Sequence, residues 1–250
     1  MAFPLTVHLG YGQEKIETSS QKQKLGTRAV TPDGRVFYYA ENSGTAITTG
    51  GQIVDGIAAV GAHDGDLATA ALAAGSLTVT TTTSLTVTKD QYKDGYLFIN
   101  DNAAQGEVYR IKSNTAVSSA AGLEIRLDEP DGIRTAFTTS TQFGLMYPPY
   151  KDIKLMDNDG TMTTGPLGVT TIAVTADYFC WIQTAGPAAV LSGAATFVVG
   201  DAVGISKADE NGAIDLWDAS TEEDSRPIGT SMGVVSVDTE YGWVMLAIRD

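Results

Sequence analysis

Short runs of alternating apolar and polar residues dominate this sequence, and the clearest lie between residues 94 and 130. The run at 123–127 places Leu123, Ile125 and Leu127 on one side and charged side chains on the other. A two-residue period of this kind is typical of a strand with one buried and one solvent-exposed face. Similar runs at 96–100 and 107–112 are separated by glycines that permit tight turns. The stretch therefore predicts an antiparallel meander.

Strand patterns continue on both sides of the meander. A Thr-Pro-Asp-Gly turn at 31–34 predicts a hairpin between 25–30 and 35–40, and the threonine-rich run at 76–88 predicts a strand or a hairpin. Further strands are expected at 169–175, 178–183, 188–191, 202–206, 213–217, 230–237 and 243–248. The last run is apolar on both faces, so we expect it to lie centrally or to have a face covered by another layer or subunit.

Helix signals are nearly absent from this pattern. Residues 64–75 are the best candidate, because an Asp can cap the start and the Ala/Leu run that follows favours helix. The predicted fold class is therefore all-β, with antiparallel meanders and hairpins that form β-sandwich or barrel-like units and with very little helix.

Two prolines in the run 146–150 mark a domain boundary, since proline is excluded from central strands. We expect an N-terminal strand and polar linker arm at 1–24, a β-rich domain at 25–150, and a β-barrel or sandwich-like domain at 151–250. A chain of 250 residues is long enough for such domains to bury a substantial core.

The first residues alternate as a strand would, and a polar linker follows them. The apolar positions are Phe3, Leu5, Val7, Leu9 and Tyr11. A tethered terminal strand can add to the edge of a neighbouring sheet, in its own chain or in another copy. Alternatively it is an edge strand of its own sheet. The first alternative makes these five residues the candidate interface.

Net charge restricts the partners. The chain carries a formal charge of −14 with a pI near 4.4, which repels phosphate backbones and disfavours nucleic acid as a partner. Residues 1–40 hold five basic and three acidic residues, so the rest of the chain carries −16. The N-terminal arm and the body of another copy therefore attract each other, weakly in salt.

The cysteine content and the hydropathy of the sequence disfavour disulfide-bonded, secreted and membrane-spanning proteins. The lone Cys180 cannot form an internal disulfide, and its apolar surroundings in the sequence predict a buried, inert side chain. No basic region followed by an apolar core opens the sequence, so no signal peptide is expected. No apolar run reaches the roughly 18–20 residues that span a bilayer. We expect a soluble protein that is synthesised in a cytoplasm, without a membrane partner.

Acidic turns are the only metal-like patterns. The run Asp157-Asn158-Asp159-Gly160 departs from the spacing of a calcium loop, because its acids are crowded and position 168 is Gly. We interpret it as a turn, and the runs at 209–212 and 222–224 as a hairpin turn and a solvated loop. Asp64-Gly65-Asp66 has no converging ligand in the sequence. No metal site and no cofactor are expected.

Catalytic motifs are missing as well. The sequence lacks nucleophile-elbow, phosphate-loop and dinucleotide-binding patterns, and His8 and His63 are its only histidines. We therefore expect a protein without enzymatic activity and with no catalytic residues. Trp181, Trp217 and Trp243 could form a sugar-stacking platform, although aromatic residues in strands more often lie in a core.

The order of motifs in the C-terminal half resembles that of a known family. The runs KDGYLFINDNAAQGEVYRIKSN, LEIRLDEP and MYPPYKDIKL are followed by YFCWIQTAGPAAVLSGAATFVVGDAVGIS, IGTSMGVV and GWVMLAI. This glycine placement and strand pattern, over roughly residues 25–250, is similar to β-rich virion proteins of tailed bacteriophages. The C-terminal part is similar to small barrel proteins that decorate phage heads.

This resemblance implies a structural role. It implies a capsid decoration, or cement, protein that binds the outer surface of the phage head, contacts the major capsid protein and bridges neighbouring capsomers. It also implies self-association, as a homotrimer, and a location on the virion after synthesis in the host cytoplasm. The rival interpretation is a tail or host-binding protein, either an adhesin or a carbohydrate-binding module.

Overall fold

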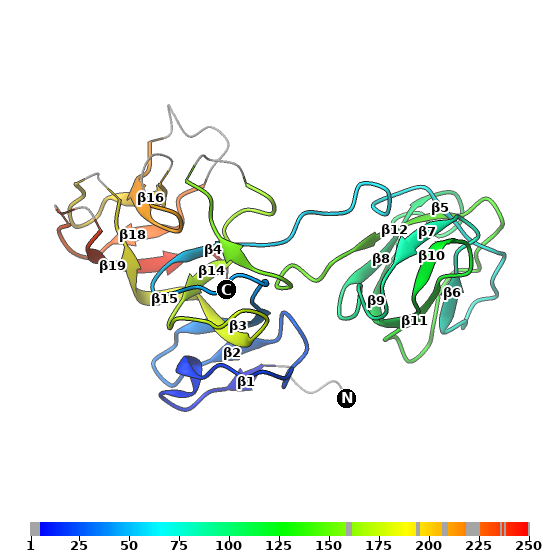
Figure 1. Cartoon of the computed structure of the whole chain (residues 1–250), viewed down its shortest axis with the longest axis horizontal. Helices are drawn as coiled ribbons and strands as arrows, with labels where there is room; N and C mark the ends of the chain where they lie inside the picture. The colour runs from blue at the N-terminus through cyan, green and yellow to red at the C-terminus, as the bar shows by residue number, and fades with distance from the viewer. Residues whose placement is uncertain are drawn as a thin grey trace. The chain divides into compact units, whose positions relative to one another are not determined.

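The computed structural model describes residues 6–158, 162–193, 196–206, 210–218, 226–235, 237 and 239–249. Within these ranges the regular structure is β-strand apart from one turn of 3-10 helix, η1 (Gln13–Lys15) (Figure 1). The predicted all-β fold with antiparallel, curled sheets is confirmed.

The chain divides into two compact units. Unit 1 joins residues 1–57 to residues 149–250, and unit 2 is the intervening stretch 58–148. This division differs from the predicted contiguous segments 1–24, 25–150 and 151–250, although the predicted boundary at residue 150 lies beside the return crossing. The reason is long-range pairing: β4 (Ile53–Asp55) pairs with β13 (Lys154–Leu155) and β14 (Gly168–Thr170). Local sequence carries no signal for such a pairing.

The remaining strands of unit 1 form one large sheet. They are β1 (Val7–His8), β2 (Arg28–Val30), β3 (Val36–Glu41), β15 (Phe179–Leu191), β16 (Ala202–Ile205), β17 (Ile214–Leu216), β18 (Gly229–Ser231) and β19 (Tyr241–Ala247). Their order in the sheet is β1-β2-β3-β15-β19-β18-β16-β17, and β14 joins the branch with β4 and β13 to β15. The hairpin predicted around residues 31–34 is confirmed by the pairing of β2 with β3. The hairpin predicted around 209–212 is confirmed by the pairing of β16 with β17, with Asp209 itself outside the described residues.

β15 is the central strand, and it replaces two predicted ones. The sequence separates 178–183 from 188–191 because Gly186 and Pro187 interrupt the strand pattern. The strand nevertheless continues because its partners change along its length: β3 pairs with it only as far as Ala185, while β19 pairs with it from there to Leu191. Gly186 takes a φ of 90°, and the register with β3 shifts just before it, so the strand is irregular at this point.

The last strand, β19, lies between β15 and β18, which agrees with the predicted central position. Its two apolar faces differ in burial. One face is buried (Gly242, Val244 and Leu246), and the other is exposed (Tyr241, Trp243 and Met245). Within the described part of this chain, the second face therefore remains uncovered.

The N-terminal strand belongs to the sheet of its own chain. β1 pairs in parallel with β2, and Leu9 just after it is buried against Ala29, Phe37 and Trp181. Val7 lies partly buried at the same cluster, whereas Tyr11 exposes 67% of its surface. Phe3 and Leu5 lie outside the described residues. Of the two alternatives for this segment, the described part forms the edge strand of its own sheet, and the interface role of the five residues stays a prediction.

Unit 2 consists of a six-stranded sheet and a two-stranded ribbon. The sheet has the order β5 (Leu67–Ala68), β12 (Gln142–Met146), β8 (Tyr96–Asp101), β9 (Val108–Asn114), β11 (Glu124–Leu127) and β6 (Thr78–Thr80). The ribbon pairs β7 (Leu85–Val87) with β10 (Val117–Ala120). A bridge between Thr69 and Thr81 connects the two outer strands, β5 and β6. The sheet therefore closes on itself, which leaves no long unpaired edge.

The core of unit 2 confirms the predicted meander. β8, β9 and β11 match the predicted runs to within about two residues. The residues predicted to share a buried face are buried together, among them Ile111, Leu123, Ile125 and Leu127. Two-residue alternation was a reliable signal here because one face of each strand meets the closed core.

One prediction for unit 2 is wrong, and of the two alternatives predicted for the threonine-rich run one is confirmed. The helix predicted at 64–75 is wrong: Leu67 and Ala68 form β5 against β12, and Leu72 bridges Phe137. A short Ala-rich segment gains little from helix propensity, so strand pairing that buries Leu67 prevails. The threonine-rich run does contain strands, but β6 pairs with β11 and β7 pairs with β10, so the two do not form a hairpin with each other.

Other expectations fall partly outside the described ranges. Asp157 contacts Lys154, and Asn158 donates its N–H to the side chain of Asn211, while Asp159, Gly160 and residues 222–224 are not described. None of the helices in the described part of the chain has the length and apolarity needed to cross a membrane.

Candidate functional site

Buried carboxylates are the first groups to test for chemistry, and they serve the fold. Asp55, at the end of β4, is fully buried. It accepts the backbone N–H groups of Gly56, Thr163 and Thr164 and the hydroxyl of Thr164 at 2.6–2.9 Å. These four hydrogen bonds satisfy the buried carboxylate and fix the 162–164 loop to β4.

Other acids are also tied to neighbours. Asp94 lies 3.9 Å from a guanidinium nitrogen of Arg110, and Asp66 accepts a hydrogen bond from Asn100. In the parts of the chain that the structure describes, no three His, Cys, Asp or Glu side chains gather as metal ligands.

The nucleophile and base candidates are distributed between the units. His63, in unit 2, is almost fully buried with its Nδ1 2.6 Å from the Tyr92 hydroxyl, and burial lowers the pKa of its imidazole. Cys180, in unit 1, is 1% exposed, and burial raises the pKa of its thiol to about 12. A thiol that stays protonated at neutral pH is a poor nucleophile. The sequence prediction of a buried Cys180 is confirmed.

The three tryptophans do not form a shared platform. Trp181 is buried and stacks edge-on against Tyr39 at 4.9 Å, so it belongs to the core near β1. Trp217 is half-buried after β17. Trp243, in contrast, is 60% exposed on β19 opposite Ala189. Only Trp243 among them presents most of its ring to solvent.

Trp243 borders a hollow of about 400 Å³ on unit 1, here called the β15–β19 hollow. Its walls come from η1, the start of β3, the loop before β4, and strands β14, β15 and β19. They are lined by Lys15, Arg35, Gly50, Gly51, Val169, Thr170, Thr171, Gln183, Pro187, Ala188, Ala189, Tyr241 and Trp243. The hollow therefore combines two exposed aromatic rings with polar groups from distant parts of the chain.

The ring of Tyr241 is fixed by the backbone beneath it. A Cβ on Gly51 would come within 2.6 Å of Cε1 of Tyr241 and within 2.9 Å of the Ala189 carbonyl oxygen. Gly51 also has a φ of 77°, a conformation that other residues adopt only with strain. Glycine at this position lets the tyrosine ring lie directly against the loop before β4.

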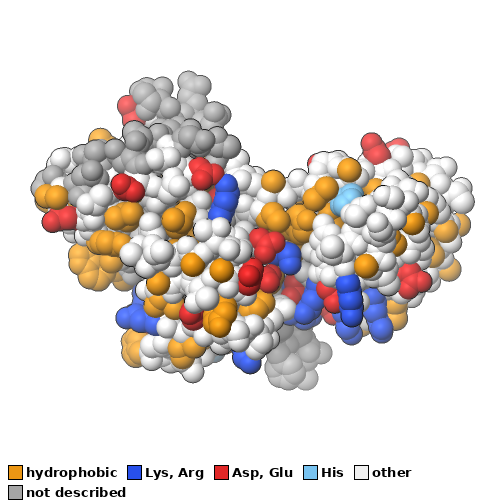
Figure 2. All heavy atoms as spheres, in the orientation of Figure 1, with side chains coloured by type: hydrophobic (Ala, Val, Ile, Leu, Met, Phe, Trp, Pro, Cys, Tyr) orange, Lys and Arg blue, Asp and Glu red, His pale blue; other side chains and the backbone are white. Residues whose placement is uncertain are grey.

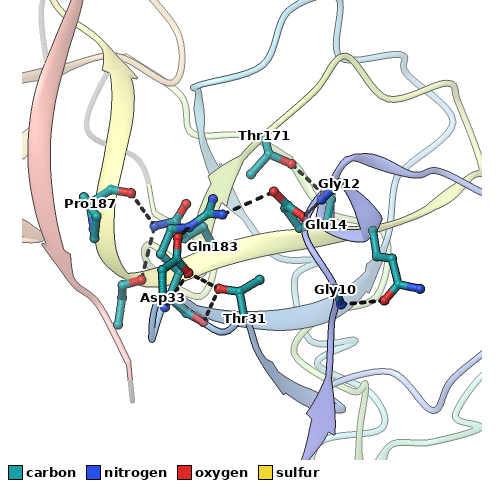
Figure 3. Close-up of polar contacts among 11 residues, drawn as sticks. Gly10, Gly12, Glu14, Thr31, Asp33, Thr171, Gln183 and Pro187 are labelled. Atoms are coloured by element: carbon teal, nitrogen blue, oxygen red, sulfur yellow. Dashed lines mark hydrogen bonds and ion pairs between the residues drawn. The ribbon is translucent and has the colours of Figure 1, made fainter.

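A polar network holds Arg35, one of the residues that line the hollow (Figure 3). Arg35 donates to Asp33 at 2.8 Å and contacts Glu14 at 3.3 Å. Glu14 in turn accepts the N–H of Gly12, and its backbone carbonyl accepts the hydroxyl of Thr171. These contacts join η1, the β2–β3 turn and the segment after β14, so the guanidinium has a defined position.

Two further polar side chains make defined contacts, and of these Gln183 lines the hollow. The Thr31 hydroxyl donates to Asp33 and lowers the pKa of that carboxyl, with Arg35 adding to the effect. The side chain of Gln183 is buried, and its Nε2 donates to the carbonyl oxygens of Ala185 and Pro187 at 3.2 and 2.9 Å. Neither of these bonds uses the Oε1 of Gln183.

A second surface feature lies near the hollow. Two loops meet where Phe197 bridges Val235, and the N–H of Gly200 donates to the Ser231 carbonyl. They expose the apolar side chains of Val198, Val199, Met232 and Val234 by 48–66%, a group here called the valine–methionine patch. Figure 2 shows hydrophobic side chains gathered over the region of β18 and β19. Exposed apolar surface of this kind marks interaction sites on folded proteins.

Sequence reasoning identified Trp243 as an aromatic candidate but missed the hollow around it. The alternation of Tyr241, Trp243 and Met245 with small or aliphatic residues was visible, yet it did not show which face was covered. Gly51, Arg35 and Gln183 carry no local signal, because long-range strand pairing brings them together.

Comparison with known proteins finds no relative of this chain. No family model, no curated protein and no solved structure matches this chain.

Proposed function

We propose that this chain is a non-enzymatic structural protein of a virion. In this proposal it is a decoration protein, made in the host cytoplasm, that binds the outer surface of a tailed-phage head. It contacts the major capsid protein and bridges neighbouring capsomers. The observation that carries the proposal is the valine–methionine patch on unit 1, together with the family resemblance of the sequence.

The patch suits a protein partner. Its side chains come from two loops that a bridge and a backbone hydrogen bond hold together, so the surface is defined before any partner binds. Covering a half-exposed Val or Met side chain is worth about 1 kcal/mol. One such contact is weak, but a protein that bridges repeated capsomers makes it many times, and avidity then strengthens attachment without a tight single site.

The charge of the chain is consistent with this role. A formal charge of −14 disfavours attachment to packaged or released DNA, and it leaves the apolar patch as the favoured contact surface. Self-association as a homotrimer is part of the proposal and rests on the resemblance. Its candidate contacts include the N-terminal residues Val7 and Tyr11.

Binding to assembled heads tests the proposal directly. Purified particles that lack decoration are mixed with the protein and sedimented, and occupancy is measured for the wild type and for Val234→Asp. We expect the variant to lose most of its occupancy, because a carboxylate in the patch must be desolvated on docking. Val108→Asp is the matched control, since Val108 is 58% exposed in unit 2 and its replacement should leave occupancy unchanged.

Two results would contradict the proposal. One is the absence of the protein from purified virions. The other is equal binding of Val234→Asp and the wild type, which would exclude the patch as the contact surface.

The second candidate is a tail or host-binding protein, and the β15–β19 hollow favours it. Exposed aromatic rings next to polar groups are typical of sites that recognise small polar ligands. Copy number separates the two candidates, because a head decoration is present in hundreds of copies whereas an adhesin is scarce and remains with purified tails.

A further inference from the structure

Tyr241 and Trp243 are exposed on a strand whose other face is core. Their alternate neighbours on β19 are buried, so these two rings lie on the outer face of the sheet. Tyr241 is 47% exposed and Trp243 60% exposed, and both line the same hollow. Large aromatic side chains at a concave site offer flat apolar surface to a ligand.

The walls of this hollow are fixed without a ligand. Gly51 allows the ring of Tyr241 to lie against the backbone, and two carbonyl oxygens hold the amide of Gln183. Arg35 is held between Glu14 and Asp33. A site that is already ordered loses little conformational entropy on binding.

The charges around the hollow select against ions. Lys15 and Arg35 line it, and the two carboxylates that contact Arg35 balance their charge. None of the described residues that line the hollow is acidic, so a cation finds no carboxylate among them. Anions are repelled at longer range by the formal charge of −14. A neutral ligand with hydroxyl groups needs no carboxylate partner and is not repelled by the net charge.

We propose that the β15–β19 hollow binds a neutral oligosaccharide. The apolar face of one sugar ring lies on Trp243, and the adjoining ring lies near Tyr241. Sugar hydroxyls donate to the Oε1 of Gln183 and accept from Lys15 and the hydroxyl of Tyr241. A volume of about 400 Å³ is within the range of small-molecule sites, roughly 300–1,000 Å³. This inference holds whether the protein decorates a head, belongs to a tail or acts apart from a particle.

Ligand-observed NMR on the full chain tests the inference. The probes are short malto-, cello- and chito-oligosaccharides, and oligogalacturonate is the anionic comparison. We expect saturable binding of at least one neutral series and none of the uronate. Trp243→Ala should weaken that binding about tenfold or more, while Trp243→Phe should retain part of it because a smaller aromatic face remains.

Met245→Ala is the matched control. Met245 lies on the same exposed face of β19 but does not line the hollow, so its replacement should leave the affinity unchanged. Circular dichroism of each variant shows whether the fold is retained. Gly51→Ala gives a second, independent perturbation: it displaces the ring of Tyr241 and should weaken binding while Trp243 is intact.

Several outcomes would overturn the inference. No detectable binding of any neutral series would do so, as would binding that Trp243→Ala leaves unchanged. Preferential binding of the uronate would contradict the charge argument. If Trp243→Ala instead altered self-association without any effect on sugars, the exposed rings would be a contact between copies. Loss of sugar binding leaves the attachment test with Val234→Asp unaffected, so the two proposals fail separately.

Discussion

At the scale of single residues, Gly95 shows how a missing Cβ constrains unit 2. A Cβ there would collide with the carbonyl oxygen of Met146 and come within 2.9 Å of the carbonyl oxygen of Tyr92. Tyr92 lies between β7 and β8, and Met146 is the last residue of β12. Both oxygens belong to the backbone, so they cannot move aside as a flexible side chain would. We expect Gly95→Ala to lower the free energy of unfolding by about 2–3 kcal/mol, measured by urea denaturation.

Gly61→Ala is the matched control for this prediction. No atom lies within 4 Å of a Cβ at Gly61, and its φ is outside the positive range. The change should therefore alter stability by no more than about 0.5 kcal/mol. Equal losses in the two variants would show that the close approach at Gly95 is not what requires glycine.

His63 gives unit 2 a pH dependence. Burial lowers the pKa of its imidazole below the ordinary 6.5, so the folded protein holds it neutral where the unfolded chain binds a proton. The contribution to stability is complete above the unfolded pKa of 6.5. It is lost as the pH falls from there toward the lower folded value.

Urea midpoints measured across this pH interval check the prediction. The wild type should lose stability as the pH falls below 6.5, and His63→Gln should lose less because it lacks the titrating group. Parallel curves for the two proteins would contradict the assignment to His63.

At the scale of elements, β1 tests whether the N-terminal strand is core or contact surface. Leu9 is 6% exposed in a cluster with Phe37 and Trp181, whereas Tyr11 is 67% exposed. Leu9→Ala should therefore cost about 2–5 kcal/mol of unfolding free energy, because it leaves a cavity beside β2 and β3. Thermal and urea unfolding measure this loss.

Tyr11→Ala is the comparison for that strand. It should change the stability of unit 1 by no more than about 0.5 kcal/mol. If stability instead rises with protein concentration, β1 completes the sheet of another copy, and the assignment of β1 to its own chain is contradicted.

The elements also show where sequence patterns are sufficient. The meander was predictable because Ile111, Ile125 and Leu127 alternate with charged residues and meet one closed core. Two stretches misled the prediction. Helix propensity at residues 64–75 is overridden by the pairing of β5 with β12. Gly186 indicated a break between two strands, but β15 continues through it because its partner changes from β3 to β19.

The candidate site was much less accessible to sequence reasoning. Trp243 was visible as an aromatic residue in a strand, but its exposure depends on which face of β19 the rest of the sheet leaves open. Gly51, Arg35 and Gln183 reach the hollow from three separate segments. Such convergence follows from long-range register, and a single sequence contains no local pattern that specifies it.

At the scale of the whole molecule, unit 2 is an insertion into unit 1. The chain leaves unit 1 after residue 57 and returns at residue 149, and a Cβ on Gly56 would come within 2.9 Å of the carbonyl oxygen of Pro149. Departure and return points are therefore adjacent. Each unit also has its own apolar clusters, which is the physical requirement for independent folding.

Excision of residues 58–148 tests this organisation. Because the ends at Gly56 and Pro149 already lie side by side, a short Gly-Ser link should join them with little strain, and unit 1 should remain folded. Residues 58–148 expressed alone should fold as well, since the bridge from Thr69 to Thr81 closes their sheet without help from unit 1. NMR spectra of each piece, overlaid on that of the full chain, measure both expectations, and calorimetry of the full chain should show two transitions. A single cooperative transition, or a piece that is unfolded alone, would mean that the two units stabilise each other and that the closed sheet of unit 2 is insufficient by itself.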